Sequence, residues 1–300
     1  MSAASDPLVI LDGGLSNALE DRGHDLSDAL WSARLLRDAP SEIAAVHRAY
    51  YRAGAMVATT ASYQASVVGF ERAGVDRAEA ERLITSSVHL AREVRDTFPG
   101  RLVAASVGPY GAMLADGSEY RGRYGVSRRV LHDFHAPRLE LLASAGPDLL
   151  AVETIPDADE AEVIVELLAE LDLPAWFSYS IEGSHTRAGQ PLADAFAIPG
   201  AVDQVIAVGV NCCAPEDVLP AVRTAVAVTG KPAIAYPNRG EAWNAVARAW
   251  VGDGRGPAEF ARGWVEAGAA YVGGCCRVGP EDIRLLADAT AHSRPPVLPA

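Results

Sequence analysis

The four cysteines of this chain occur as two adjacent pairs, each placed after a short apolar run. Cys212-Cys213 follows the run 205–210 through Asn211, and Cys275-Cys276 follows the run 269–272 through two glycines. Three cysteine thiolates can hold a zinc ion tetrahedrally and leave one coordination position open, as in a catalytic site. An isolated cysteine is most often a buried packing residue. Two pairs at the ends of two predicted strands instead favour a metal site.

The other interpretations of these cysteines depend on the cellular compartment. Residues 1–7 lack the basic and apolar regions of a signal peptide, and no apolar run approaches the roughly 18 to 20 residues that span a bilayer. We therefore expect a soluble, cytoplasmic protein with no membrane partner. Because disulfides are rare in that compartment, the thiols are predicted to be metal ligands, reactive groups or packing residues.

The charge of the chain excludes a further class of function. The formal net charge is −13, from 39 acidic and 26 basic residues, and the basic residues lie among acidic ones. A nucleic-acid-binding protein needs a basic surface that displaces counterions from the phosphates. We therefore expect no nucleic-acid partner and look for small-molecule substrates.

The elements that would position the cysteines follow from the hydrophobic pattern. Short apolar runs alternate with longer amphipathic segments along almost the whole chain. The predicted strands are 8–11, 56–59, 102–107, 149–152, 175–180, 205–210, 233–236 and 270–273. The predicted helices are 41–53, 76–95, 127–145, 157–171, 191–198, 215–228, 257–267 and 281–289. Ser41 and Asp157 are the expected N-caps of their helices, and Gly54 the expected C-terminal stop.

Eight strands that alternate with about eight helices predict a (β/α)₈ TIM-type barrel. The second possibility is an open doubly wound sheet, but the first strand is not followed by the Gly-x-Gly-x-x-Gly turn of its dinucleotide-binding form. No linker or shift in composition divides the chain, so residues 1–300 are predicted to be one domain with a core from about 8 to about 290. Residues 111–125 are predicted to be a long loop, whose part 116–125 could act as a lid. Residues 294–300 are predicted to be a proline-rich tail.

In such a barrel, the residues that follow the strands gather on one face. Most of these residues are small and polar, two are carboxylates, and four are the cysteines. They are Asp12, 59–64, Ser106, Glu153, 178–180, 211–213, Asn238 and 275–276. Two strand ends separated by more than sixty residues in sequence can thus bring the two cysteine pairs together.

Several motifs at these strand ends resemble those of the homocysteine S-methyltransferase family. The motifs are Asp12-Gly13-Gly14, Glu153-Thr154, Gly209-Val210-Asn211-Cys212 and Gly273-Gly274-Cys275-Cys276-Arg277. Tyr236-Pro237-Asn238 and Ser62-Tyr63-Gln64-Ala65 also match the branch that uses S-methylmethionine or S-adenosylmethionine. The resemblance runs in order from about residue 8 to about residue 290. The cysteine motifs are specific, whereas Asp-Gly-Gly or Glu-Thr alone would be weak signals.

The resemblance implies a zinc-dependent (β/α)₈ barrel that methylates homocysteine to methionine. It makes Cys212, Cys275 and Cys276 the zinc ligands. Cys213 is expected to pack in the core, because adjacent residues of a strand point to opposite faces. That both Cys275 and Cys276 serve as ligands requires a turn, which Gly273-Gly274 would permit. The substrate thiol, deprotonated at the zinc, would be the nucleophile, so no further catalytic residue is expected.

The remaining strand-end residues are assigned to substrate binding. Glu153, assisted by Asp12, is expected to bind the substrate ammonium group, although either carboxylate could instead cap backbone amides. The backbone N–H groups of Gly13 and Gly14 could meet the substrate carboxylate. Ser62 and Asn211 are expected to line the site.

The resemblance leaves the methyl donor and the acceptor open. We expect S-methylmethionine as the donor, with S-adenosylmethionine second, because no cobalamin- or folate-binding segment accompanies the predicted barrel. A second possibility is a zinc methyltransferase with another acceptor or donor, such as selenohomocysteine or a betaine. A third is a non-catalytic zinc-binding or corrinoid-partner barrel, which the ring of polar residues disfavours.

Overall fold

Eight parallel strands form a nearly closed barrel in the part of the chain that the structure describes. The structure is a computed structural model and describes residues 7–26, 31–244, 249–252 and 254–293. The strands are β1 (Val9–Ile10), β2 (Val57–Thr59), β3 (Leu102–Val107), β4 (Leu149–Ile155), β5 (Ala175–Tyr179), β8 (Val205–Asn211), β9 (Ala233–Tyr236) and β12 (Ala269–Val272). Their spatial order is β1-β12-β9-β8-β5-β4-β3-β2, and a parallel bridge between Leu11 and Val57 brings β1 beside β2. The predicted (β/α)₈ barrel is confirmed.

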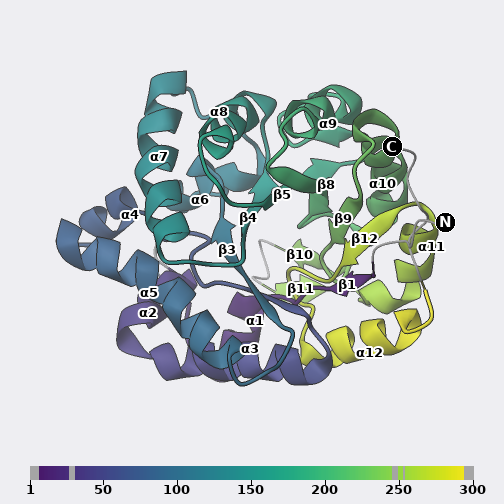
Figure 1. Cartoon of the computed structure of the whole chain (residues 1–300), viewed down its shortest axis with the longest axis horizontal. Helices are drawn as coiled ribbons and strands as arrows, with labels where there is room; N and C mark the ends of the chain where they lie inside the picture. The colour runs from purple at the N-terminus through teal and green to yellow at the C-terminus, as the bar shows by residue number, and fades with distance from the viewer. Residues whose placement is uncertain (1–6, 27–30, 245–248, 253, 294–300) are drawn as a thin grey trace.

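Eight helices form a ring around the strands (Figure 1). They are α3 (Pro40–Ala53), α5 (Arg77–Arg95), α7 (Arg128–Ser144), α8 (Ala158–Ala169), α9 (Leu192–Gly200), α10 (Pro215–Thr229), α11 (Ala261–Glu266) and α12 (Pro280–Thr290). Each helix contacts the next in this order, and α12 contacts α3, so the ring of helices is complete. Among the described residues, no helix combines the length and the apolar character that crossing a membrane would require.

Further elements occupy the connections between the strands and the helices of the ring. The short helices are α1 (Leu15–Glu20), η1 (Trp31–Arg34), α2 (Leu35–Asp38), α4 (Val67–Arg72), α6 (Tyr110–Leu114), η2 (Ser118–Tyr120) and η3 (Pro257–Glu259). Two hairpins are formed by β6 (Ile181–Glu182) with β7 (His185–Thr186) and by β10 (Ala242–Asn244) with β11 (Ala249–Val251). All of these lie outside the predicted strands and helices, except that η3 lies in the predicted helix 257–267.

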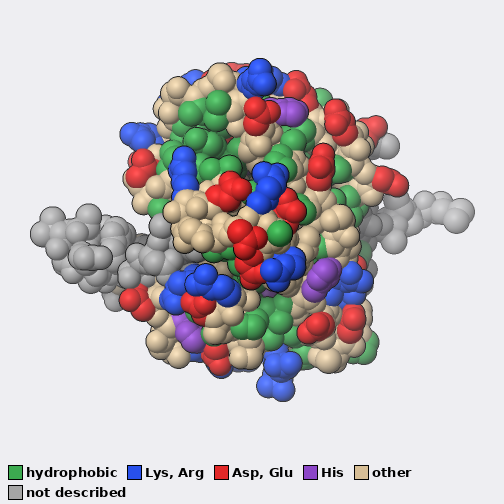
Figure 2. Space-filling view, turned by 90° about the vertical axis from the view of Figure 1, so that its left-hand side faces the viewer, with side chains coloured by type: hydrophobic (Ala, Val, Ile, Leu, Met, Phe, Trp, Pro, Cys, Tyr) green, Lys and Arg blue, Asp and Glu red, His purple; other side chains and the backbone are tan. Residues whose placement is uncertain are grey.

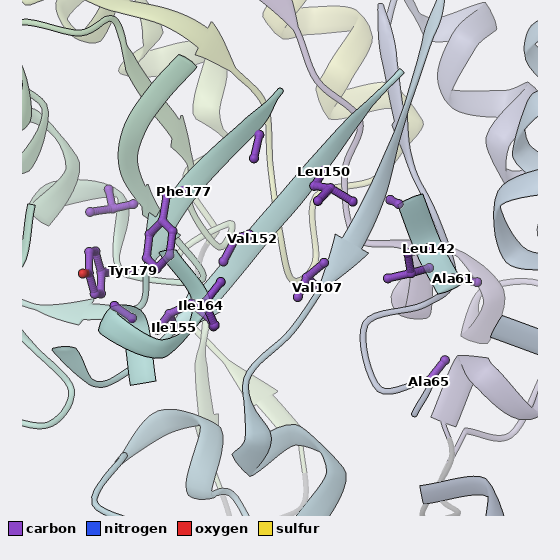
Figure 3. Packing of buried hydrophobic residues seen from close by; sticks show 14 of the residues in the cluster. Ala61, Ala65, Val107, Leu142, Leu150, Val152, Ile155, Ile164, Phe177 and Tyr179 are labelled. Atoms are coloured by element: carbon purple, nitrogen blue, oxygen red, sulfur yellow. The ribbon is translucent and has the colours of Figure 1, made fainter. Parts of the chain in front are cut away.

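The hydrophobic core has two layers, because strand side chains alternate between the two faces of the barrel. The larger layer lies between strands and helices, where Leu150 and Val152 of β4 pack with Phe177 of β5 and Ile164 of α8 (Figure 3). The smaller layer fills the barrel interior. It consists of Leu11, Val57, Ala104, Leu149, Ala151, Trp176, Ala207, Ile234 and Tyr236. The interior is therefore packed with side chains up to the level of the strand ends.

Some predicted boundaries were wrong for local reasons. Residues 111–125 are not a plain loop, because they contain most of α6 and all of η2. The predicted helix 257–267 is divided into η3 and α11. Ser41 is not an N-cap: α3 begins one residue earlier at Pro40, because proline suits the first helical turn. The predicted tail 294–300 lies outside the described residues.

Two predicted helix-terminal residues take the roles assigned to them. The Asp157 side chain accepts a hydrogen bond from the Asp159 N–H at 3.1 Å and caps α8. Gly54 ends α3 with a φ of 110°, a left-handed conformation that glycine adopts without steric cost.

The surface carries its charges in mixed form. Figure 2 shows acidic and basic side chains interspersed on one face of the molecule. Exposed ion pairs such as Arg128–Glu162, at 3.1 Å, are typical of such a surface, and each contributes at most about 1 kcal/mol to stability. Among the described residues on this face, the basic side chains form no continuous stripe.

Candidate metal centre and substrate site

The alternation of strand side chains brings polar groups into one end of the barrel. On β4, Leu149 and Ala151 point into the barrel interior, and Glu153 follows at the same spacing of two residues. The same spacing continues the interior rows of the neighbouring strands. It gives Ser106 on β3, Ser178 on β5, Asn211 on β8 and Tyr236 on β9. These residues form the floor of the site and are buried.

Three of the four cysteines meet above this floor. The Sγ atoms of Cys212, Cys275 and Cys276 all lie within 4.8 Å of one another, and the Cys212 and Cys276 sulfurs are 3.6 Å apart. Zinc–sulfur bonds of about 2.3 Å place tetrahedral sulfur ligands about 3.8 Å apart. The three side chains therefore fit a metal ion that takes sulfur ligands, with one position left for another group.

The orientation of Cys212 depends on an unusual backbone conformation. Asn211 is the last residue of β8 and faces the interior, so a continued strand would turn Cys212 outward. Cys212 instead has a φ of 49°, which is uncommon for a residue other than glycine. Cys213 is fully buried among the residues between strands and helices. The prediction that Cys213 is a packing residue is confirmed.

The second pair lies in a turn after β12, and two close contacts explain the preceding glycines. A Cβ atom on Gly273 would lie 2.6 Å from Leu11 Cβ, and one on Gly274 would lie 2.1 Å from Val278 Cγ1. The Cys275 N–H donates to the Pro237 carbonyl at 2.8 Å, and a similar bond holds the next residue. There the Cys276 N–H donates to Asn238 Oδ1 at 3.1 Å. These bonds hold the turn so that both sulfurs face the site.

The three thiols are electrostatically coupled. Hydrogen bonds from the Cys275 and Cys276 thiols hold the pKa of Cys212 well below its usual range. The same interactions raise the pKa of Cys275 and Cys276 well above the usual range, because each donates its proton to the Cys212 sulfur. These interactions favour loss of the proton from Cys212 before the other two thiols, and a metal ion bound by the three sulfurs would replace their protons.

A cavity of about 130 Å³ opens beside the sulfurs. Most of the predicted site residues line this cavity. The full lining consists of Asp12, Gly13, Gly14, Leu15, Ser16, Asn17, Thr59, Thr60, Tyr63, Tyr120, Glu153, Thr154, Cys212, Tyr236, Gly274, Cys275 and Cys276. Two predicted residues, Ser62 and Asn211, do not appear in this lining and lie behind it.

Asn211 and Ser62 lie behind the cavity lining and form hydrogen bonds to other residues of the strand ends. Asn211 Oδ1 accepts hydrogen bonds from the Thr154 N–H at 2.7 Å and from Ser178 Oγ at 2.8 Å. Ser62 Oγ donates to the Ser106 carbonyl at 2.8 Å. Both side chains are fully buried, so their hydrogen bonds position strand ends and neighbouring site residues.

The two carboxylates lie in buried positions that favour the protonated form. Burial raises the pKa of Glu153 to about 7, although a hydrogen bond from Ser106 opposes this shift. Burial also raises the pKa of Asp12 to about 7. Asp12 accepts hydrogen bonds from the Thr59 N–H at 2.7 Å and from the Thr59 hydroxyl at 2.9 Å. Asp12 therefore caps a backbone amide as well as lining the cavity, whereas the hydrogen bonds to Glu153 come from the Ser106 and Tyr236 side chains.

The structure changes the role expected for one glycine. The Gly14 N–H donates to the Val278 carbonyl at 2.9 Å and is not available to a substrate carboxylate. A Cβ atom on Gly13 would lie 2.2 Å from the same carbonyl oxygen, so this position requires glycine for close approach. Of the two glycines predicted to meet the substrate carboxylate, Gly13 therefore remains the candidate.

Sequence reasoning did not single out Tyr120. This residue lies in η2, within the segment predicted as a covering loop, and its hydroxyl is 3.4 Å from Cys212 Sγ. The signal that could have found it was its place in that loop. A loop that covers a site presents some of its side chains to the site.

A (β/α)₈ barrel with three convergent cysteines at the strand ends defines a class of thiol-ligated metal enzymes. A sequence model of the homocysteine S-methyltransferase family matches residues 9–290. The chain belongs to this family of methyltransferases. The resemblance inferred from the motifs is therefore confirmed.

Individual relatives agree with this assignment. The chain is 45% identical over 291 residues to the homocysteine S-methyltransferase of Escherichia coli (strain K12), and the match covers 93% of this chain and 94% of the relative. It is 41% identical over 302 residues to the selenocysteine Se-methyltransferase of Brassica oleracea var. italica, with 93% and 87% covered. The metallated form of the homocysteine methyltransferase MmuM from Escherichia coli superposes with a TM-score of 0.84, at 43% identity over 94% of this chain and 96% of the other.

Proposed function

We propose that this protein transfers a methyl group from a sulfonium donor to the thiol of L-homocysteine and forms methionine, with a zinc ion held by Cys212, Cys275 and Cys276. The observation that carries the proposal is the convergence of these three sulfurs beside a cavity lined by Glu153. Family membership gives the reaction class, and the relative described as metallated supports a resident metal. Zinc suits a site of three sulfurs with one open position.

The chemical step moves a methyl group between two sulfur atoms. A bound zinc ion would supply a lowered pKa for an incoming thiol, so that the thiol enters the reaction as a thiolate at neutral pH. The thiolate sulfur forms a bond to the methyl carbon as the bond from that carbon to the sulfonium sulfur breaks. The bonding electrons stay with the donor sulfur, which leaves as a neutral thioether. The thiol proton is lost to solvent, so no side chain has to act as an acid or base.

The protein's contribution is to bind and orient the two substrates. Glu153 in its ionised form would bind the substrate ammonium group, and Asp12 would add a second negative charge near it. The Gly13 backbone could approach the substrate carboxylate closely. Ser62 and Asn211 would act indirectly, because they hold the strand ends on which these groups lie.

The donor we propose is S-methylmethionine, with S-adenosylmethionine as a poorer substitute. The motif at Tyr236-Pro237-Asn238 supports this choice. Tyr236 lines the cavity, and Asn238 holds the Cys276 N–H, so this motif contributes directly to the site.

The experiment that tests the proposal combines metal analysis with an assay of methionine formation. Native protein should contain close to one zinc per chain and form methionine from homocysteine and S-methylmethionine. Cys275→Ser should lose both the metal and the activity. Full activity in zinc-free native protein would contradict the proposal, as would a Cys275→Ser variant that keeps zinc and full activity. Zinc without turnover on sulfonium donors would favour a non-catalytic partner protein.

A second candidate acceptor is a selenol. The similarity to the selenocysteine Se-methyltransferase of Brassica oleracea favours this possibility. A selenol has a lower pKa than a thiol and uses the same displacement chemistry. Competition between selenocysteine and homocysteine for one limiting donor measures the preference, and we expect homocysteine to be methylated faster.

A further inference from the structure

We propose that Tyr120 is a positioning residue of the metal centre, whose hydroxyl donates a hydrogen bond to the sulfur of Cys212. This inference rests on the proposed function, because it concerns the same three sulfurs. It adds a residue outside the predicted metal and substrate sets, and it assigns a structural purpose to the segment 116–125.

The contact itself is direct. The Tyr120 hydroxyl oxygen lies 3.4 Å from Cys212 Sγ, and Cys212 is only 3% exposed. Tyr120 also lines the cavity that opens beside the sulfurs. A cysteine sulfur bound to a metal has lost its proton and can only accept a hydrogen bond, so the phenol must be the donor. The two atoms are thus already close enough for this hydrogen bond before a metal ion binds.

The turn that carries Tyr120 is internally braced. Asp116 Oδ1 accepts a hydrogen bond from the Ser118 N–H at 2.9 Å at the start of η2. The Tyr120 N–H donates to the Gly117 carbonyl at 3.1 Å, and the Gly122 N–H donates to the Ser118 carbonyl at 2.9 Å. The backbone around Tyr120 is therefore held on both sides of the residue.

The segment is also fastened to α8 by two acids, which we call the α8 latch (Asp157 and Glu160). The Arg123 N–H donates to Asp157 Oδ2 at 2.9 Å. The Tyr124 hydroxyl donates to Glu160 Oε2 at 2.9 Å. A Cβ atom on Gly122, whose φ is 67°, would lie 3.0 Å from Asp157 Oδ2, so the segment approaches the latch closely.

Buried neighbours hold Glu160 in place. Its Oε1 atom accepts a hydrogen bond from the Tyr110 N–H at 2.6 Å and lies 2.9 Å from His135 Nε2. Glu160 is 1% exposed and His135 is fully buried. Glu160 is thus held by contacts from Tyr110 and His135, and the Tyr124 hydroxyl connects it to the segment that carries Tyr120.

A hydrogen bond to a metal-bound sulfur changes the properties of the metal centre. It withdraws electron density from the sulfur and fixes the orientation of the ligand. Loss of such a partner typically lowers metal affinity or activity by about 10- to 100-fold. Tyr120→Phe removes the hydroxyl and leaves the ring, so it isolates this bond from the packing of the loop.

The test uses the full-length protein loaded with zinc or with cobalt(II), which reports sulfur ligation by its charge-transfer absorption. We expect Tyr120→Phe to bind zinc about tenfold more weakly in competition with a chelator. We also expect its sulfur-to-cobalt band to lie at longer wavelength, because a sulfur without the hydrogen bond is more electron-rich. The matched control is Tyr51→Phe, which removes a tyrosine hydroxyl bonded to the Leu102 carbonyl at 2.8 Å, at the first residue of β3. This control should leave both readouts native.

A second variant tests the latch. Tyr124→Phe removes the bond to Glu160 and should shift the cobalt band in the same direction as Tyr120→Phe, by a smaller amount. Native zinc affinity together with a native cobalt band in a folded Tyr120→Phe protein would overturn the inference. A phenolate-to-cobalt band in the native protein that is missing from Tyr120→Phe would also overturn it, in favour of direct ligation. Failure of the native protein to bind zinc or cobalt would refute the proposed function itself, which is a different result.

Discussion

Cys212-Cys213 and Cys275-Cys276 each follow a barrel strand, yet the first pair places one sulfur at the candidate metal centre and the second pair places two. The first pair continues directly from β8, and a positive φ at Cys212 separates its two side chains. The second pair is separated from β12 by two glycines and lies in a turn, where side chains no longer alternate between the two faces of the barrel. The two pairs are therefore alike in sequence but differ in backbone context.

This difference shows what selects a ligand among neighbouring cysteines. The residue type supplies the sulfur, but the backbone decides which side of the barrel wall the sulfur reaches. In the first pair the two side chains lie on opposite sides of the barrel wall. Cys212 faces the site, and Cys213 packs between strands and helices. At the second pair the chain has already left the wall, and hydrogen bonds to Pro237 and Asn238 hold the turn over the site.

The comparison predicts opposite results for two neighbouring alanine substitutions. Cys212→Ala should lower zinc affinity and methionine formation by more than about 100-fold, because losing a ligand costs more than losing a residue that supports one. Cys213→Ala should retain both and lose about 1 to 2 kcal/mol of stability, as for a small cavity in a core. Metal content, turnover and denaturant unfolding measure the three quantities. Equal metal loss in both variants would refute the separation of the pair.

The turn that carries the second pair can be broken without touching a sulfur. Gly274→Ala would place a Cβ atom 2.1 Å from Val278 Cγ1, so the turn must shift. We expect a loss of about 2 to 3 kcal/mol in the free energy of unfolding, as for an overpacked site, together with weaker zinc binding. Gly263→Ala on α11 is the control, because nothing lies within 4 Å of its added Cβ. The control should be neutral or stabilise the protein by up to about 1 kcal/mol. A Gly274→Ala protein with native stability and native zinc affinity would show that the glycine is not required.

Much of this arrangement could be predicted from the sequence. The alternation of apolar runs and amphipathic segments predicts the barrel, since each of the eight predicted strands overlaps an observed one. The strands 102–107 and 233–236 match in both of their bounds. The spacing of two residues along β4 also explains why Glu153 faces the site, because this periodicity is a local property of the sequence.

Other features could not be predicted because they depend on contacts between distant segments. The φ of 49° at Cys212 could not be predicted, because cysteine as a residue type does not indicate a positive φ. The bond between the Gly14 N–H and Val278 joins residues from opposite ends of the chain. Tyr120 contacts Cys212 across 92 residues of sequence, and the place of Tyr120 in a covering loop does not indicate which atom of the site it meets.

Glu153 provides a pH-dependent test of the substrate site beside the first pair. Its pKa of about 7 lies above the usual value of 4.5, mainly because the group is buried, and the Cys212 thiolate also raises it. Glu153 is therefore largely ionised at pH 8 and largely protonated at pH 6. An ammonium group binds the ionised form, so affinity for the ligand should fall as the pH falls. For one such group, the expected weakening between pH 8 and pH 6 is about tenfold.

Methionine is the suitable probe for this measurement, because it has the ammonium group but no thiol that titrates. Calorimetry on the native protein should show the weakening, and Glu153→Gln should bind weakly at pH 8 with a flatter pH dependence. Asp12→Asn serves as the matched variant, because burial also raises the pKa of Asp12 to about 7. Its hydrogen bonds from Thr59 reduce its availability, so we expect it to contribute less. An affinity of the native protein that stays constant from pH 8 to pH 6 would exclude a titrating carboxylate from ammonium binding.

The two pairs also differ in what covers them, and the smallest expected effect concerns that cover. Tyr120 places the segment 116–125 against Cys212, and we predict that this segment closes further when homocysteine binds. Amide hydrogen exchange across 116–125 should then slow severalfold on adding homocysteine to the zinc-loaded protein. The N–H groups of Tyr120 and Gly122 already donate within the turn, so their exchange reports opening of the whole segment. The turn after α4, where the Gly74 N–H donates to the Glu71 carbonyl, is the internal control and should not change. Equal exchange rates with and without homocysteine in 116–125 would show that the segment is a static wall of the site and would remove the lid hypothesis.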